Sequence, residues 1–253
     1  MSFSLLFLNF ALQTTQHNLI IEMFGIGNKK KVVTLESAGT LKNFITDEEK
    51  FSVTELVVTG ELNGTDLKLI REMAGYTASG RNSEGKLKRL DLKNARFVPG
   101  GEKYARKNDG YCTIEEADVI PQRAFRKCDK LQVAILPEGT KKIEGHAFER
   151  CTHLSSITIP EGVEYIGSRA FRKCYELKTI SIPSTVVDMG KETFSEDGKL
   201  GKLYVLAVKP PMIYVNTFFA VAVSELKLYV PAEASSAYKK ATTWKRFRNM
   251  KEL

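Results

Sequence analysis

The sequence predicts an α/β solenoid, in which stacked coils place a parallel β-sheet on one face and short helical turns on the other. A pattern of fixed positions returns every 23 residues, and each copy holds a strand-like stretch that ends in proline. A single copy has too few apolar residues to bury a core alone, whereas stacked copies cover one another. The recurring residues are Ala124–Phe125, Ala147–Phe148 and Ala170–Phe171, then Cys128, Cys151 and Cys174, Leu131, Leu154 and Leu177, and Pro137, Pro160 and Pro183, with Thr193–Phe194 adding a further step.

Each element of a coil follows from its residues. Leu154–Pro160 alternates apolar and polar residues as a strand does, and proline ends it because it has no N–H for the ladder. Glu161–Gly162 predicts a turn, and Val163–Ile166 predicts a second short extended piece. Gly167 is expected to permit a bend with positive φ. Ser168–Cys174 is then expected to form a short helical turn that faces its alanine and phenylalanine inward.

The ends of such a sheet need covering, and the flanking segments predict how this happens. We divide the chain into a leader or disordered N-terminus (1–30), an N-terminal cap with irregular repeats (31–118), regular repeats (119–206), and a degenerate last repeat with a C-terminal cap (207–253). In the N-terminal cap, 41–45 and 66–73 are expected to be helical, with Thr65 as N-cap and Gly75 as stop. Segments 76–86 and 99–110 are expected to be exposed loops.

At the other end, Leu226–Pro231 predicts one more strand and Ala234–Ala241 a helix, with Trp244 and Phe247 available to fill the end of the core. The first twelve residues form an apolar run without a basic start or a clear cleavage site. Three alternatives remain for this run: it is a signal peptide, it precedes a true translation start at Met23, or it is an ill-ordered tail. No stretch of 18 apolar residues predicts a membrane span.

The repeat unit A-F-x-x-C-x-x-L-x-x-I-x-I-P resembles the BspA-like, or treponemal, class of bacterial leucine-rich repeats over residues 119–206. Residues 226–244 resemble the C-terminal cap of such proteins, and Leu62–Met73 resembles their N-terminal capping segment. The resemblance implies a right-handed solenoid, and a protein that is exported, displayed on the cell surface and engaged in adhesion or protein binding. The sequence departs from the family in two respects: its export signal is poor, and its repeats are few, so any binding face is small.

The cysteine column is expected to be structural. A spacing of 23 residues places Cys128, Cys151 and Cys174 in a row along the core, where each thiol can donate weakly to a turn carbonyl. A disulfide between adjacent coils is the alternative. Cys112 lies outside the column and is expected on a loop, as the most reactive thiol.

Enzyme chemistry finds little support in the sequence. The three histidines are His17, His146 and His153, and none forms a recognisable pair with a nucleophile. No phosphate-binding loop, carboxylate cluster or zinc spacing is present, so neither a cofactor nor a metal site is predicted. A thiol hydrolase in segments 76–86 or 99–118, with Cys112 as nucleophile, stays as a remote alternative.

Basic residues recur at fixed positions of the repeat and predict a basic stripe on the turn side of the solenoid. The formal net charge of +8 and the pI near 9.2 also favour acidic partners, although solubility alone explains a charge of this size. Rows of like charge repel unless a ligand or counterions compensate. The stripe ends in the fourth repeat, and a solvated surface is the alternative. Its residues are Arg123, Arg126, Lys127, His146, Arg150, Arg169, Arg172 and Lys173, with Glu149 interrupting one row.

The outer face of the sheet is a second candidate binding surface. Its expected residues are Ser156, Thr158, Lys178, Thr179 and Ser181, which alternate with buried leucine and isoleucine. We therefore predict a non-enzymatic binding scaffold, monomeric and exported or surface-associated, for an unknown protein or anionic glycan. The alternative is a structural spacer. Nucleic acid is an improbable partner because aromatic residues do not interleave with the stripe.

Overall fold

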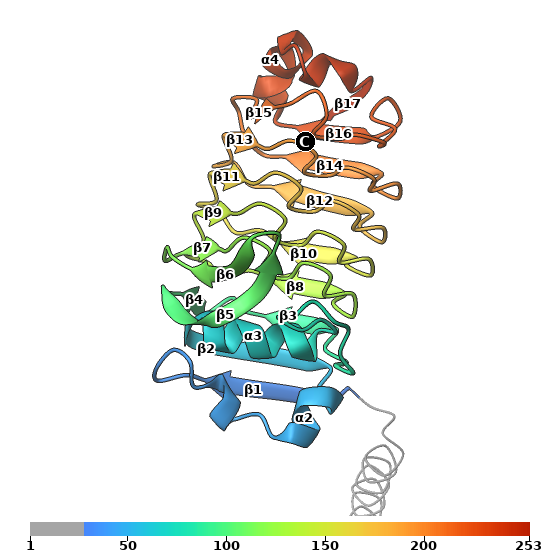
Figure 1. Ribbon diagram of the computed structural model, residues 1–253. Helices are drawn as coiled ribbons and strands as arrows, with labels where there is room; N and C mark the ends of the chain where they lie inside the picture. The colour runs from blue at the N-terminus through green and yellow to red at the C-terminus, as the bar shows by residue number, and fades with distance from the viewer. Residues whose placement is uncertain (1–27) are drawn as a thin grey trace, which may run out of the picture.

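The computed structural model describes residues 28–253 as an elongated stack of coils with parallel strands (Figure 1). The predicted leader, residues 1–30, lies outside the described residues except for its last three positions. The first strand, β1 (Lys30–Thr34), begins at the last of these. Within residues 28–253, no helix combines the length and apolar character needed to cross a lipid bilayer.

The principal strand ladder runs along the whole stack. It begins with β1, β2 (Glu55–Leu62), β3 (Arg89–Asp91), β8 (Val133–Ile135) and β10 (Ser156–Thr158), all in parallel register. Beyond β10 the row of strands continues in a separate four-stranded parallel sheet, whose first strand lies beside β10 and which contains β12 (Thr179–Ile182), β14 (Lys202–Val205), β16 (Lys227–Val230) and β17 (Asn249–Glu252). A short strand, β4 (Ala95–Phe97), pairs with the end of β2.

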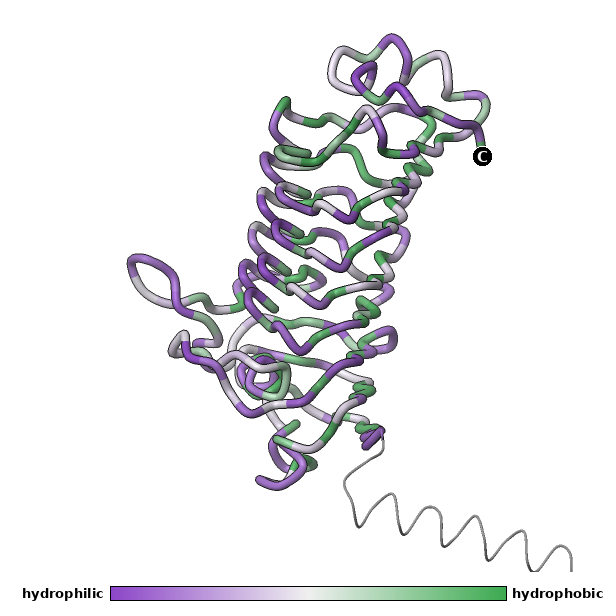
Figure 2. The backbone as a smooth tube through the Cα atoms, turned by 90° about the vertical axis from the view of Figure 1, so that its right-hand side faces the viewer, coloured by the Kyte–Doolittle hydropathy of each residue, from purple (hydrophilic) through white to green (hydrophobic). Residues whose placement is uncertain are grey.

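A second parallel ladder joins the two-residue strands that follow each proline turn. It contains β7 (Val119–Ile120), β9 (Lys142–Ile143), β11 (Tyr165–Ile166), β13 (Asp188–Met189) and β15 (Met212–Ile213). In the central coils the paired residues stand one repeat apart, as Tyr165 and Asp188 do. Figure 2 shows the result in side view, with hydrophobic segments recurring from coil to coil.

The segment of each regular coil predicted as a short helical turn, such as Ser168–Cys174, is a run of hydrogen-bonded turns instead. Every second amide donates three residues back, as Arg172 N does to Arg169 O at 3.2 Å. The intervening amides point along the stack, so that Lys173 N donates to Ser195 O of the next coil at 3.0 Å. Two residues per turn adopt a left-handed conformation, with φ of 59° at Arg169 and 64° at Lys173. The prediction of helical turns is therefore wrong, because half of the backbone amides in each turn donate to the neighbouring coil and not within the turn.

Gly167 serves a different purpose from the one predicted. Its φ is not positive. A Cβ atom at Gly167 would lie 2.4 Å from Gly145 N of the preceding coil, which is closer than any real contact. Gly190, one coil further, meets Ser168 N in the same way at 2.5 Å. The repeat therefore needs glycine here so that neighbouring backbones can approach.

The core contains a continuous column of stacked phenylalanines. Successive ring centroids from Phe125 to Phe194 lie 5.0 to 5.5 Å apart, with the ring planes within 23° of parallel. Phe218 continues the column at 5.2 Å from Phe194, although it falls outside the regular repeats that the sequence predicts. Coil packing therefore persists where the sequence pattern degenerates.

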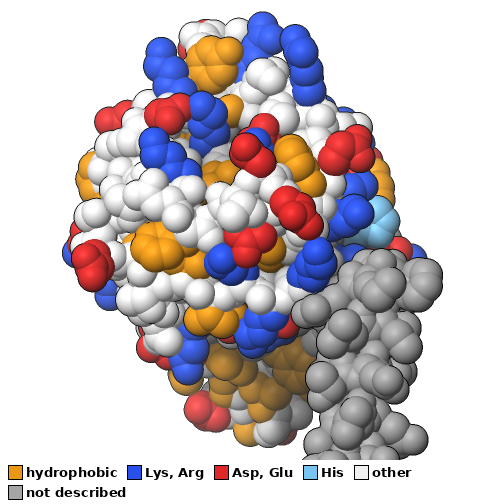
Figure 3. Space-filling model, turned by 90° about the horizontal axis from the view of Figure 1, so that it is seen from below, with side chains coloured by type: hydrophobic (Ala, Val, Ile, Leu, Met, Phe, Trp, Pro, Cys, Tyr) orange, Lys and Arg blue, Asp and Glu red, His pale blue; other side chains and the backbone are white. Residues whose placement is uncertain are grey.

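The N-terminal coils are covered by helices. These are η1 (Leu41–Asn43), α2 (Asp47–Ser52) and α3 (Gly64–Met73). The N-cap of α3 is Asn63 rather than the predicted Thr65, since the Asn63 side chain accepts from Thr65 N while Asp66 accepts from Asn63 N. Gly75 follows α3 with a φ of 100°, as the predicted stop requires. Figure 3 shows acidic and basic side chains interspersed on this end of the molecule.

Segment 99–110, predicted as an exposed loop, forms most of a β-hairpin. Strand β5 (Gly100–Lys107) pairs antiparallel with β6 (Gly110–Ile114). The hairpin lies beside α3 in the N-terminal half of the molecule (Figure 1). Tyr104 and Cys112 on its inner side are buried, so the hairpin belongs to the core.

The C-terminal end follows the sequence prediction closely. After β16 come η2 (Ala232–Ala234), α4 (Ser235–Lys240) and η3 (Trp244–Arg246), and β17 then returns to the principal ladder. Trp244 and Phe247 are buried, and Phe247 packs edge-on against Phe218 at 5.3 Å between centroids. The indole of Trp244 donates to Pro211 O at 2.7 Å.

Candidate functional site

The predicted basic stripe lies on the turn side of the stack, and two of its three rows occupy the left-handed positions of the turns. Arg123, His146 and Arg169 form one such row, with φ between 59° and 61°. The other left-handed row has φ between 63° and 64° and consists of Lys127, Arg150 and Lys173. Arg126 and Arg172 belong to the third row and have no such constraint. The rows are thus set by the backbone geometry of the turns.

Glu149 lies at the centre of the stripe and pairs with its cations. Its carboxylate is buried, with the side chain 5% exposed, and lies 2.6 Å from Arg126 Nε, 3.0 Å from His146 Nδ1 and 3.3 Å from Arg172 Nη1. Burial raises the pKa of Glu149, but hydrogen bonds from His146 and Arg126 and the charge of Arg126 outweigh it, so the pKa is well below its usual value. The carboxylate therefore stays ionised and neutralises its neighbours.

Two more carboxylates extend this pairing toward the C-terminus. Glu192 binds Arg169 at 3.0 Å, and Glu196 binds Lys173 at 3.1 Å while also receiving Arg172. The pKa of Glu192 is lowered by hydrogen bonding to Arg169. Glu192 and Glu196 lie in the fourth repeat, where the basic stripe ends, and they are the counterions of its last basic residues. Five of the eight stripe residues thus contact one of these three carboxylates, and this reduces the positive charge that the stripe offers to an anionic ligand.

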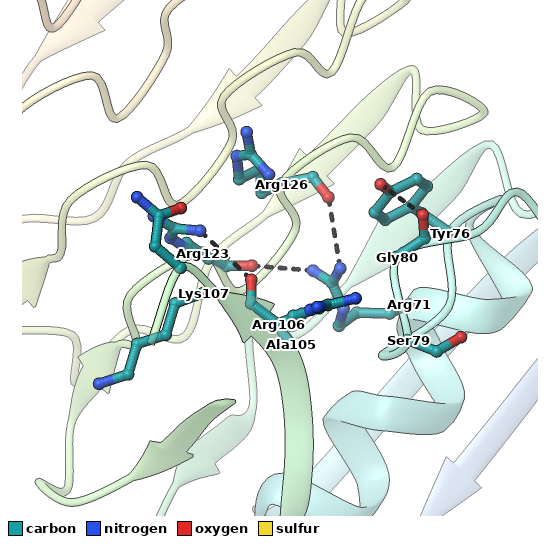
Figure 4. Close-up of a pocket in the computed structure, with 10 residues that line it drawn as sticks. Arg71, Tyr76, Ser79, Gly80, Ala105, Arg106, Lys107, Arg123 and Arg126 are labelled. Carbon is teal, nitrogen blue, oxygen red and sulfur yellow. Dashed lines mark hydrogen bonds between the residues drawn. The ribbon is translucent and has the colours of Figure 1, made fainter. Parts of the chain in front are cut away.

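Arg123, which has no carboxylate partner among the described residues, lies at the N-terminal end of the stripe beside Arg126, where three residues that the sequence analysis missed join them. Arg71 from α3 and Arg106 and Lys107 from β5 meet Arg123 and Arg126 around a cavity of about 370 Å³ (Figure 4). The signal that could have placed them is the turn sequence Asn108–Gly110, which favours a hairpin that would bring Arg106 and Lys107 to the first regular coil.

Arg71 is almost fully buried, at 2% exposure, and it contacts the first regular turn. Its guanidinium donates to Arg123 O and Ala124 O, each at 2.8 Å, and to Arg126 O at 3.4 Å. On the same turn, Tyr104 Oη donates to Gln122 O at 2.7 Å. These side chains supply the donors that a preceding coil would otherwise provide.

The second predicted surface, the outer face of the strand ladder, is exposed as expected. Its residues Ser156, Thr158, Lys178, Thr179 and Ser181 all reach solvent. In the next strands, Tyr204 and Tyr229 follow Ser181 in register, and their rings stack at 4.5 Å between centroids. The face therefore extends from hydroxyl groups in the centre to paired aromatic rings near the C-terminus.

Lysines border the C-terminal part of this face. Lys178, Lys202 and Lys227 line a groove of about 720 Å³ and form no ion pair with any described residue. Lys199 also lines the groove but is paired with Glu176. Glu225 also lines the groove, so the strand face carries more lysine than carboxylate charge beside its hydroxyl groups.

The four cysteines are reduced and buried. Cys151 Sγ donates to Phe125 O at 3.0 Å and Cys174 Sγ to Phe148 O at 3.3 Å, as predicted for the column. The expectation of a loop position for Cys112 is wrong, because this residue lies on β6. Burial raises the pKa of Cys112 and outweighs the nearby positive charges, so its thiolate is disfavoured. This weighs against the thiol hydrolase alternative. Among residues 28–253, no cluster of three metal-ligating side chains is present.

Comparison with known proteins identifies the repeats. Residues 114–229 match the model of the BspA type leucine rich repeat region in six copies. No curated protein matches the chain. Among solved structures, the leucine-rich repeat protein TpLRR of T. pallidum is 28% identical, with a TM-score of 0.42, over 58% of this chain and 65% of its own. The chain thus spans slightly less than two thirds of that relative.

Two further solved structures have lower identity. The pneumococcal vaccine antigen PcpA is 18% identical, with a TM-score of 0.41, over 88% of this chain and 69% of its own. A leucine-rich repeat protein from Bacteroides ovatus is 14% identical, with a TM-score of 0.39, over 88% and 52% respectively. The family match agrees with the repeat pattern, the parallel ladders and the phenylalanine column. Residues 114–229 of this chain are therefore similar to the BspA type leucine rich repeat region.

Proposed function

We propose that the chain is a non-enzymatic binding scaffold that holds an acidic partner protein against the outer face of its strand ladder. The observation that carries this proposal is the row of exposed side chains along the principal strands, from Ser156 and Thr158 on β10 to Ser181, which is in register with Tyr204 and Tyr229. Stacked repeats commonly use such extended faces for recognition. The unpaired lysines beside the face favour a partner with acidic side chains.

The remaining expectations belong to the same proposal. We infer right-handed coils of 23 residues closed at both ends, the division at residues 31, 119 and 207, a monomer, and an exported, surface-associated protein with an adhesin-like role. The BspA-type region supports these inferences because the resemblance implies them. The basic stripe stays a prediction of lesser weight, because Glu149, Glu192 and Glu196 pair with five of its eight residues.

Binding to an array of extracellular matrix proteins and anionic glycans, at low and physiological salt, tests the proposal. The full chain is compared with T158E and S181E, which place negative charge on the strand face, and with Q122E, which places it on the exposed turn side. Retention on proteins that falls in the two face variants and persists in the control supports the strand face. Retention on glycans alone favours a glycan partner, and retention nowhere favours a spacer. Loss in the control with retention in the face variants would overturn the proposed surface.

A further inference from the structure

The cavity between α3, the β5–β6 hairpin and the first regular turn is lined by more positive charge than the protein neutralises. Arg71, Arg106, Lys107, Arg123 and Arg126 face it, and no carboxylate is among its lining residues (Figure 4). Arg126 is paired with Glu149, as described above. The other four cations form no ion pair with any residue in the described part of the chain.

This arrangement contrasts with the C-terminal part of the stripe. Two coils further on, Arg169 and Arg172 both have Glu192 within 4 Å. Arg150, in the coil between, has no carboxylate partner among the described residues, but it does not line the cavity. Cations that converge without counterions repel one another, and the fold carries that cost. Arg106 is exposed at the end of β5 and has no structural contact that would require its charge. Fold stability alone therefore does not account for the cluster.

Arg71 supplies a second, independent observation. Its terminal nitrogens complete the hydrogen bonding of the first turn, but its Nε is buried and has no acceptor among the described residues. The Nε of Arg123, on the opposite wall, is buried and unpaired as well. A buried N–H without an acceptor costs about 1–3 kcal/mol, and an anion in the cavity would supply acceptors to both groups.

We propose that this cavity binds a tetrahedral oxyanion, sulfate or phosphate, carried by a small ligand such as a sugar. Guanidinium groups present fixed forks of N–H donors that suit such oxygens, and Lys107 adds a mobile charge at the rim. A cavity of about 370 Å³ lies at the small end of known ligand pockets, so it fits one sugar-sized group and no long segment of polymer. The site is separate from the strand face and does not depend on it.

Isothermal titration calorimetry with the full chain, at constant ionic strength, tests this site. The probes are inorganic sulfate, inorganic phosphate, glucose 6-sulfate, glucose 6-phosphate and unmodified glucose. The test variant is R106Q/K107Q, which removes two cations from the hairpin rim. The matched control is K86Q/K103Q, which removes two exposed cations outside the cavity. Far-ultraviolet circular dichroism checks that each variant is folded.

We expect one of the charged probes to bind with a stoichiometry of one and glucose not to bind. R106Q/K107Q should weaken binding at least tenfold, since each lost charge-assisted hydrogen bond is worth about that factor, whereas K86Q/K103Q should change it less than twofold. Tighter binding of the sulfated or the phosphorylated sugar identifies the source of the oxyanion. Absence of binding by all charged probes, or an equal loss in both variants, would overturn the proposal.

Discussion

Arg71 Nη1 donates to the carbonyl oxygen of Ala124 at 2.8 Å, and it takes the donor position that a backbone amide occupies one coil further along. There, Phe125 N donates to Ala147 O at 2.7 Å, and the same bond recurs further along the stack. Where the regular coils begin, the Arg71 side chain from α3 therefore supplies the hydrogen-bond donors for Ala124 O and Arg126 O that backbone amides supply in later coils.

Loss of this side chain should destabilise the N-terminal coils. We expect R71M to lower the free energy of unfolding by about 3 kcal/mol, because it leaves buried carbonyls without donors. Y104F, which removes only the bond to Gln122 O, should cost about 1 kcal/mol. Urea unfolding measures both, with K68M on the exposed side of α3 as a control that should change little. Equal stability of R71M and K68M would contradict the role of Arg71.

Glu149 should stabilise the turn side in a pH-dependent manner. At pH 7, E149Q is expected to lower the free energy of unfolding by about 3 kcal/mol, because Arg126 and Arg172 then lose a buried partner. The folded pKa lies below the unfolded value of about 4.3, so this contribution is complete above pH 5 to 6 and lost as the pH falls toward the folded pKa.

Urea unfolding at several pH values checks this expectation. The difference between wild type and E149Q should shrink between about pH 5 and pH 2. E176Q, which breaks the exposed pair with Lys199, serves as the control and should leave stability nearly unchanged at every pH. A difference that stays constant down to pH 2 would show that Glu149 acts through packing and not through its charge.

The thiols should be unreactive in the folded protein. Burial raises the pKa of Cys128 to about 11 and that of Cys112 above its usual value, so little thiolate exists at pH 8. We expect a disulfide reagent such as DTNB to titrate no thiol within minutes in the native protein and all four in guanidinium chloride. Rapid reaction of a single thiol, abolished by C112S, would instead revive the thiol hydrolase hypothesis.

The left-handed turn positions should tolerate glycine and reject β-branched residues. Arg150 has a φ of 63° and is exposed. R150V should cost about 1–2 kcal/mol, because a branched Cβ clashes in this conformation. R150G should be neutral or stabilising by up to about 1 kcal/mol. Thermal unfolding compares the two with K141V, at an exposed position without this constraint, and a loss in R150G as large as that in R150V would contradict the expectation.

The sequence predicts best what every coil repeats. Phe125, Phe148 and Phe171 each face the same neighbours one coil away, so their spacing alone places them in a column. The same holds for Cys151 and its backbone acceptor. For residues that contact only their own repeat unit and its copies, the repeat spacing is enough to predict the contacts.

Contacts that occur once are harder to predict. Nothing in the period indicates that Arg71 reaches the carbonyls of Ala124 and Arg126, because 53 and 55 residues separate them. The inward position of Glu149 is hidden as well, since an acidic residue in a basic row predicts only a weaker stripe. The residue types at the position of Arg169 do not predict its left-handed φ, because long polar side chains are typical of any exposed turn.

The alternation of amides in the turns gives the molecule a direction and an adjustable length. Each coil offers its unused N–H groups to the next and receives the same set from the one before, as Lys127 N to Glu149 O and Arg150 N to Arg172 O illustrate. A whole additional unit inserted between Phe148 and Phe171 would find matching donors and acceptors on both sides. Evolution can therefore lengthen or shorten this protein in whole coils, and it can do so without redesigning either terminus.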